Sequence, residues 1–186
     1  MIFDEQNPIA IETLSDLDTA LSEGERTKYD HIIRSVKIPV SHFDNHCSWS
    51  SESYTRNCIL ETEKFELILI CWEGGQITPI HDHGDEECWV KIIEGEFRET
   101  IYKKNDVGDL NSIKSAILKP SDISYMIDFM GFHSLENLSK KRSMSLHLYA
   151  KPIRNCRIFD TNLGEFVQKH LVYDTVSKVP KKLKNI

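Results

Sequence analysis

The stretch PIHDHGDEECWVKIIEGEF, residues 79–97, decides what kind of fold and site the chain can form. It places His81 and His83 one residue apart, Cys88 shortly after them, and then an apolar run that ends at Gly95. Alternate residues of a strand project to the same face, so both imidazoles can reach one ion. Buried without a metal, the two rings would need partners for all their nitrogens. The spacing predicts a metal site; the alternative is an exposed polar turn, because HDHGDEE is hydrophilic.

Short apolar runs with β character surround this stretch. They are separated by Gly, Asn, Asp, Pro or clusters of charge, which are typical of turns between strands. Many short strands without long intervening helices predict an antiparallel sandwich or small barrel. We therefore expect a mainly β fold with a barrel core over residues 54–160. The runs are 65–72, 88–95, 96–103, 115–120, 123–128, 132–139 and 143–150.

The first third of the chain has a helical pattern instead. Apolar residues recur at helical spacing over residues 8–24, and the pattern ends at Gly24. A second short helix is expected over residues 25–36, followed by an irregular segment, residues 39–54, that is rich in Ser and Asn. These patterns predict one domain, with a helical cap over residues 1–45 and a C-terminal extension over 161–186.

Composition excludes several classes of protein. A net charge of -6 argues against nucleic acid or an anionic membrane as partner. No apolar run approaches the ~20 residues that span a bilayer, and the N-terminus lacks the layout of a signal peptide. The five cysteines have no repeating spacing, which argues against a disulfide framework. We expect a cytoplasmic monomer whose basic end, KVPKKLKNI at 178–186, is solvated.

A second motif supplies a third candidate ligand. GFHSLEN contains His133, and the first motif, from Gly75 to Gly95, has a spacing that resembles that of the cupin barrels. Cys88 stands where those proteins place a metal-binding glutamate. Three neutral imidazoles would leave open positions on the ion and its full +2 charge, which suits an anionic substrate such as a thiolate.

The residues alone leave the role of the cysteine open. Cys88 could be a fourth ligand, a small buried hydrophobic residue, or a residue with chemistry of its own. Glu87 is an alternative ligand, since a shorter gap would make it the cupin glutamate. That choice puts Gly95 one residue out of register.

Five segments together resemble the cysteine dioxygenase family over roughly residues 50–160. They are YTRNC, LILICWEGG, IHDHGDEECWVKIIEGEFRET, GFHSLENLS and SMSLHLYAKP, in this order. The resemblance implies a jelly-roll-like cupin fold in which His81, His83 and His133 hold a mononuclear Fe(II). It implies oxidation of the thiol of L-cysteine by O2 to cysteine sulfinic acid, in cysteine catabolism and taurine biosynthesis, with no separate organic cofactor.

The resemblance also implies roles around the metal. Cys88 matches the family cysteine that forms a thioether with a tyrosine, here Tyr149; a cysteine there leaves a coordination position free and anchors the phenol. Arg56 matches the arginine that pairs with the substrate carboxylate, a bidentate contact that lysine cannot reproduce. Tyr54 is expected to contribute a hydroxyl nearby. Surface solvation is the alternative for Arg56.

The segment SLHLY has a pattern of its own. Ser145, His147 and Tyr149 alternate along one strand and therefore share a face, with Leu146 and Leu148 on the other. A hydrogen-bonded Ser–His–Tyr row would orient the phenol. An ordinary amphipathic strand is the alternative, and a Ser–His hydrolase is disfavoured because no nucleophile-elbow motif is present.

One departure from the family concerns substrate choice. Ala150-Lys151-Pro152 stands where the animal enzymes have Ser-Pro-Pro with a cis bond, so we expect a trans backbone here. A dioxygenase for 3-mercaptopropionate stays possible, whereas Arg56 argues against cysteamine, which has no carboxylate. A non-catalytic metal-binding cupin is the rival from another class, and the pairing of Cys88 with Tyr149 argues against it.

Overall fold

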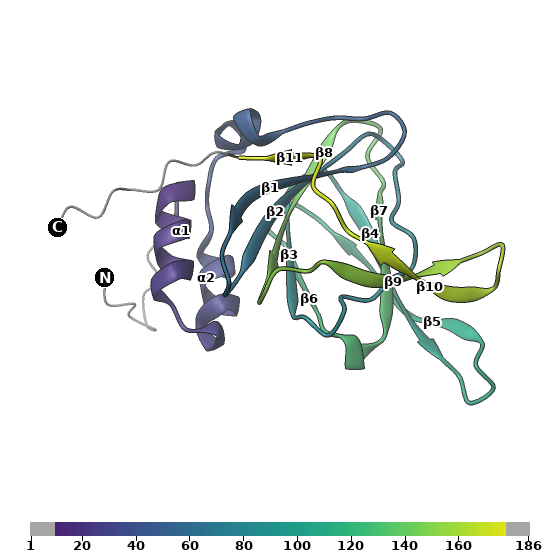
Figure 1. Ribbon diagram of the computed structural model, residues 1–186. Helices are drawn as coiled ribbons and strands as arrows, with labels where there is room; N and C mark the ends of the chain where they lie inside the picture. The colour runs from purple at the N-terminus through teal and green to yellow at the C-terminus, as the bar shows by residue number, and fades with distance from the viewer. Residues whose placement is uncertain (1–9, 178–186) are drawn as a thin grey trace.

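Two α-helices form one side of the molecule. The computed structural model describes residues 10–177 (Figure 1). Helix α1 (Leu14–Glu23) begins after Thr13, whose hydroxyl accepts a hydrogen bond from the Asp16 amide, and it ends at Gly24 as expected. The short 3₁₀ helix η1 (Arg26–Lys28) leads into α2 (Tyr29–Ser35), which confirms the second helix. No helix in the described part is long and apolar enough to cross a bilayer.

The next segment was expected to be irregular, and for its first half this was wrong. Residues Val40–His46 form a second 3₁₀ helix, η2. Phe43, which is fully buried in the cluster beneath the helices, fixes this turn to the core. A single buried aromatic residue in a polar segment gives no periodic signal.

Strands make up most of the remaining chain. All seven predicted runs contain a strand, but β1, β9, β10 and β11 were not among them. Outside β1, these additional strands are largely exposed and so lack a continuous apolar run. The elements are β1 (Thr55–Glu61), β2 (Glu66–Trp72), β3 (Cys88–Glu94), β4 (Phe97–Lys104), β5 (Leu110–Leu118), β6 (Ile123–Met126), η3 (Asp128–Met130), β7 (Phe132–Asn137), β8 (Ser143–Tyr149), β9 (Asn155–Asp160), β10 (Glu165–His170) and β11 (Thr175–Val176).

The strands form two facing layers. One layer is a six-stranded sheet in the order β11-β1-β2-β8-β3-β6. The other consists of β5-β4-β7 and the hairpin β10-β9, which isolated bridges at His81 connect to each other. The expected mainly β, jelly-roll-like fold with N-terminal helices is confirmed. The layers do not close into a barrel, because β11 and β6 end the six-stranded sheet without a further hydrogen-bonded partner among the described strands.

The six-stranded sheet is covered on both faces. Every residue of β2 and β8 is buried, which is expected only for strands packed on two sides. Along β2, Leu67 and Leu69 pack under the helices, whereas Ile68 and Ile70 pack between the two sheets. The polar side chains of β8 that face the second layer are therefore held on a rigid support.

The end of the described chain returns to the first strand. We call residues 171–177 the C-terminal strap. Its strand β11 pairs in parallel with β1, and the Asp174 amide donates to the Arg56 carbonyl (2.8 Å). The Asp174 carboxylate accepts from the Arg56 amide at 2.7 Å. Part of the predicted extension thus belongs to the main sheet, while the basic segment 178–186 lies outside the described residues.

Candidate metal centre

The three predicted ligands converge between the two layers. Candidate ligand atoms of His81, His83 and His133 all lie within 4.8 Å of one another. His81 forms backbone bridges with His133 and Ile158, and His133 belongs to β7. The expectation that His81 and His83 share a regular strand was wrong. His83 lies in the loop, where its amide donates to the Asp128 carboxylate at 2.9 Å and turns the chain.

The second nitrogen of each ring has an oxygen partner. Nδ1 of His81 lies 2.9 Å from the Pro79 carbonyl, and Nδ1 of His133 lies 2.9 Å from a carboxylate oxygen of Glu99. The His83 side chain bonds to the backbone of Met126. A carbonyl or carboxylate oxygen only accepts, so each neutral ring carries its proton on the bonded nitrogen. The other nitrogen of each ring is left with a lone pair for a metal.

The arrangement of these lone pairs fits a cation. Nε2 of His133 and Nε2 of His83 lie 3.1 Å apart. Because the outer nitrogens hold the protons, two lone pairs face each other at this distance unless a positive centre lies between them. Burial, with the neighbouring histidines, lowers the pKa of His81 to about 3 and that of His83 well below its ordinary value. Neutral imidazoles are the form that binds metals such as iron.

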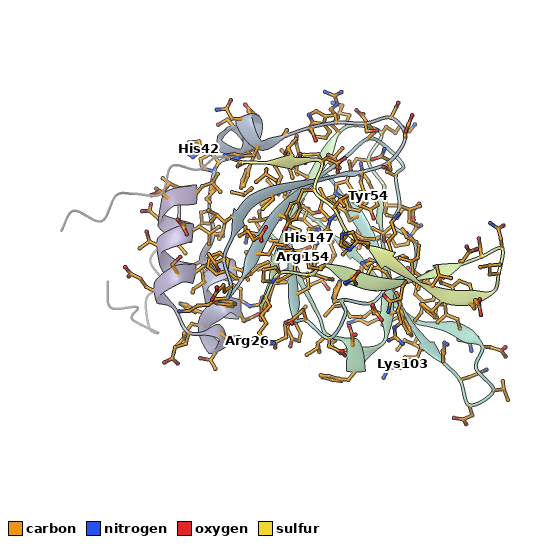
Figure 2. All side chains as sticks on the ribbon, in the orientation of Figure 1. Arg26, His42, Tyr54, Lys103, His147 and Arg154 are labelled. Atoms are coloured by element: carbon orange, nitrogen blue, oxygen red, sulfur yellow. The ribbon has the colours of Figure 1, made fainter. Side chains whose placement is uncertain are left out.

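A cavity of about 440 Å³ opens beside the histidines. Figure 2 labels Tyr54 and His147, which both line it. Arg56, His81, His133 and Tyr149 line it as well, so six of the nine predicted site residues share one space. His83 adjoins it, with its ring centroid 5.6 Å from that of Tyr149. The other lining residues are Ser53, Ile70, Ile77, Thr78, Pro79, Leu135, Ile153, Cys156, Ile158, Lys169, His170, Leu171, Val172 and Asp174.

Arg56 is a half-buried cation with two donors that lack a partner. Its Nε and Nη2 atoms are buried and have no hydrogen-bond partner. Burial lowers the pKa of Arg56, but the nearby Tyr149 and Glu66 outweigh it and raise the pKa above the ordinary value. The guanidinium is therefore charged, and the solvated surface position considered from sequence is wrong. Two unsatisfied donors on a planar cation match a carboxylate ligand.

Cys88 lies against Tyr149. The two residues are directly opposite each other on β3 and β8, and their side chains are hydrogen-bonded. Burial raises the pKa of both groups. Glu87 points elsewhere: its carboxylate bonds to Arg26 and to the Tyr125 hydroxyl, each at 2.5 Å. The alternative that Glu87 binds the metal is therefore excluded.

The polar row on β8 is real but differs from the expected one. Ser145 Oγ lies 2.9 Å from His147 Nε2, whereas Nδ1 of His147 has no partner, so the expected bond to Tyr149 is absent. The row extends in the other direction, where the Trp72 indole donates to Ser145 Oγ at 3.0 Å. The sequence patterns did not identify Trp72 as a site residue; a buried indole N–H needs an acceptor, which was the available signal.

Glu99 is a second residue that the sequence reasoning missed. It lies on β4, is only 6 % exposed, and bonds to His133. In EFRETIYK the inward positions alternate through Phe97 and Glu99, so a carboxylate stands on the apolar face. A charged residue at an inward position was the signal that could have found it.

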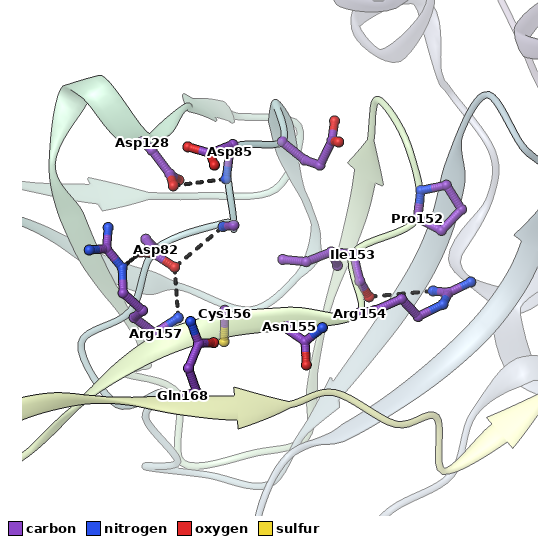
Figure 3. A pocket seen from close by; sticks show the side chains of 12 residues that line it. Asp82, Asp85, Asp128, Pro152, Ile153, Arg154, Asn155, Cys156, Arg157 and Gln168 are labelled. Atoms are coloured by element: carbon purple, nitrogen blue, oxygen red, sulfur yellow. Dashed lines mark hydrogen bonds and ion pairs between the residues drawn. The ribbon is translucent and has the colours of Figure 1, made fainter.

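A second cavity, of about 540 Å³, shares Ile153 and Cys156 with the first (Figure 3). It is lined by acidic residues, and Asp82 pairs there with Arg157 at 2.5 Å. The segment from Ala150 to Pro152 passes beside it, and no peptide bond among residues 10–177 is cis, as expected.

The chain is similar to known proteins of one family. A family model described as cysteine dioxygenase type I matches residues 20–162. Cysteine dioxygenase type 1 of Danio rerio is 31% identical over 164 residues, which are 82% of each chain. That of Bos taurus is 36% identical over 115 residues, or 60% of this chain and 58% of the relative. A solved Klebsiella pneumoniae protein with a double-stranded β-helix domain is 17% identical, with a TM-score of 0.49 over 68% of this chain and 86% of its own. The chain belongs to the cysteine dioxygenase type I family.

Proposed function

We propose that this protein is an iron-dependent dioxygenase that converts L-cysteine and O2 to cysteine sulfinic acid, with both oxygen atoms transferred to sulfur. Membership of the family supports the reaction. The observation that carries the assignment to these residues is the position of Arg56. It has two buried donors without a partner, and it lines the same cavity as His81 and His133.

The metal site is proposed to consist of His81, His83 and His133. Bound there, Fe(II) supplies open coordination positions, acidifies a thiol that binds it, and provides the electrons that activate O2. The pKa values of His81 and His83 are lowered by burial, so these two rings need no proton loss before binding. None of the three ligands is itself an anion, which favours an anionic further ligand such as a thiolate.

Arg56 is proposed to hold the substrate carboxylate. A carboxylate in the cavity would satisfy the buried Nε and Nη2 donors, which water or a neutral ligand does less well. This fixes the amino acid at one end, so that its thiol can lie at the histidines. Tyr54 lines the same wall and contributes a hydroxyl. The requirement for a carboxylate favours cysteine over cysteamine.

His147 is proposed to present a hydrogen-bond donor to the cavity. The Trp72 indole only donates, so Ser145 accepts from it and can turn its own hydrogen toward Nε2 of His147. The imidazole proton then resides on Nδ1, which is buried and unpartnered beside the substrate space. In this role Ser145 and Trp72 position His147.

We also propose a thioether between Cys88 and Tyr149, supported by their direct cross-strand pairing and side-chain contact. A bond from sulfur to a tyrosine Cε carbon, adjacent to the carbon that carries the hydroxyl, would form as the S–H and C–H bonds break. The two hydrogens, with two electrons, would reduce O2 to hydrogen peroxide. The intact mass would fall by about 2 Da, a modification that mass spectrometry reports.

We also propose a cellular context. All five cysteines are free thiols, which favours a reducing compartment such as the cytoplasm. We assign the protein there as a monomer acting in cysteine catabolism, ahead of taurine formation. Size-exclusion chromatography with light scattering would contradict this if it found a dimer.

The proposal is tested by oxygen uptake of the Fe(II)-loaded protein. L-cysteine, 3-mercaptopropionate and cysteamine are supplied in parallel, and products are identified by mass. We expect one O2 consumed per cysteine sulfinate formed. Preference for 3-mercaptopropionate would retain the iron chemistry and reassign the substrate. No uptake with any thiol at full iron occupancy would favour a metal-binding module without catalysis.

A further inference from the structure

We infer that Glu99 is a positioning residue that makes the His133 corner of the metal centre anionic, and so determines how tightly the centre holds a divalent ion. The inference rests on the proposed metal site of His81, His83 and His133. It concerns a carboxylate that lies outside the ligand set and that the sequence patterns did not identify.

The carboxylate is fixed by two contacts. One oxygen lies 2.9 Å from Nδ1 of His133, and the other accepts the hydroxyl of Ser124 at 2.6 Å. Glu99 comes from β4, His133 from β7 and Ser124 from β6, so three strands set the position of this group. Both oxygens are engaged at a site that is 6 % exposed, which leaves the side chain little freedom to rotate.

This geometry has two consequences for His133. A carboxylate only accepts, so Nδ1 carries the proton and Nε2 is free for a metal. The negative charge also increases the electron density of the imidazole, which makes it a stronger ligand. The Glu99 contact therefore orients the His133 ring with its Nε2 toward Nε2 of His83, at 3.1 Å.

The other two corners of the centre differ. His81 bonds to the carbonyl of Pro79, and His83 bonds to the backbone of Met126. Both partners are neutral, so Glu99 is the only carboxylate that bonds to a ligand ring within the described part of the chain. The sequence alone suggested a centre with no carboxylate and an uncompensated +2 charge. The negative charge of Glu99, which is hydrogen-bonded to the ligand His133, instead compensates part of the metal's charge.

A purely structural role for Glu99 would not require this geometry. An inward carboxylate costs free energy unless it is bonded or paired. Ser124 alone could satisfy only one of its oxygens, and the other is directed at a metal-binding ring rather than at a lysine or arginine. The arrangement is that of a carboxylate–histidine–metal triad, in which loss of the outer partner weakens metal binding by about 10- to 100-fold.

The test is Glu99→Gln in the full chain. The amide oxygen can still accept from His133, and the amide group can donate to Ser124, so shape and hydrogen bonds are kept while the charge is lost. We expect the Kd for Fe(II), measured anaerobically by competition with a chelator, to rise about 10- to 100-fold. Co(II) titration followed by absorbance provides a second measurement without oxidation. The melting temperature of the metal-free protein should be unchanged or higher.

Glu136→Gln is the matched control. Glu136 lies on β7 opposite Arg98, with which it forms a half-exposed 2.7 Å ion pair on the same pair of strands. Its removal should leave the Kd unchanged. Ser124→Ala, which removes only the support of Glu99, should raise the Kd by a smaller factor than Glu99→Gln does.

Two results would overturn the inference. Wild-type affinity in Glu99→Gln would mean that the charge has no part in metal binding. A lower melting temperature of the metal-free variant with unchanged affinity would make Glu99 structural. If the wild-type protein itself bound no Fe(II), the proposed function would fail together with the inference, whereas equal affinities of wild type and variant would leave the function standing.

Discussion

At Arg56, burial and charge oppose each other. Its Nε and Nη2 atoms are buried and have no partner, and an unpartnered donor of a buried cation costs free energy. Glu66, which is fully buried, stabilises the charge from a distance without bonding to those donors. A residue arranged in this way is less stable alone than with an anion in the cavity. A carboxylate substrate would remove the free-energy cost of these two unpartnered donors.

Replacement of Arg56 should therefore affect substrate binding and not the metal. In Arg56→Lys we expect the KM for L-cysteine to rise by at least tenfold, because a point charge cannot make the planar paired contact. Fe(II) content should equal that of the wild type, since Arg56 is not a ligand. Steady-state kinetics with iron analysis measures both. Unchanged KM in this variant would remove Arg56 from the binding site.

Lys91 provides a test of pH dependence. It is 3 % exposed on β3, and burial, with Lys37 and Arg34 nearby, lowers its pKa from 10.5 to about 8. Between these values the unfolded chain holds a proton that the folded chain has released, so the free energy of unfolding should rise with pH from about 8 to 10.5. Lys91→Met should be more stable than the wild type at pH 7 and lack this rise.

Urea unfolding at pH 7, 8, 9 and 10 measures the effect on stability. Lys64→Met, at an exposed position, is the control and should follow the wild-type profile. If Lys91→Met shows the same slope as the wild type over this range, another group causes the pH dependence.

Among the strands and site residues, the sequence predicted those that are recognised by residue type and local spacing. Strands β2 and β3 were found because both of their faces are mostly apolar, and the histidines because their spacing is specific. Trp72 and Glu99 were missed as site residues because their roles depend on cross-strand register. Ser145 lies opposite Ile70, next to Trp72, only once β2 and β8 are paired. No local pattern contains that information.

The position of the C-terminal strap could not be predicted from local sequence patterns either. The Tyr173 hydroxyl contacts the buried carboxylate of Glu66 and accepts from Arg154 at 2.9 Å. Arg154 in turn bonds to Glu61 at 2.6 Å. This group closes the strap over the cavity, yet its members are far apart in the chain. Only the completed sheet brings them together.

Loss of the Tyr173 hydroxyl should loosen this closure. In Tyr173→Phe the free energy of unfolding should fall by about 1–3 kcal/mol, because a buried carboxylate loses a donor. Hydrogen exchange of β1 amides should become faster and the KM for L-cysteine higher, since the strap supports Arg56. Val176→Ala, at an exposed position of β11, is the control. Unchanged exchange in β1 would show that the strap does not support that strand.

The six-stranded sheet separates the apolar cluster under the helices from the metal centre. The helices and η2 cover one face with an apolar cluster, and the metal centre lies on the other. Along β2 and β8, alternate side chains belong to the apolar cluster under the helices and to the cluster between the two sheets. Substitutions on one face of the sheet should therefore change the free energy of unfolding, and substitutions on the other face should change metal or substrate binding.

A change beneath the helices should affect stability alone. Leu21 on α1 is fully buried, and Leu21→Ala should lower the free energy of unfolding by about 2–5 kcal/mol. The Fe(II) affinity of the folded variant should equal that of the wild type. Leu163→Ala, at a position 63% exposed, should change stability by less than about 0.5 kcal/mol. A loss of iron affinity in folded Leu21→Ala would contradict the separation.

The contact between Arg56 and Asp174 also bears on synthesis of the protein. The two residues are 118 positions apart, so β1 leaves the ribosome long before its outer partner is translated. Until then β1 is an exposed edge, and its backbone donors and acceptors are open to other chains. The three histidines are all translated before Asp174, the partner of the Arg56 backbone. We therefore expect Arg56 to reach its final position only after residue 174 has left the ribosome.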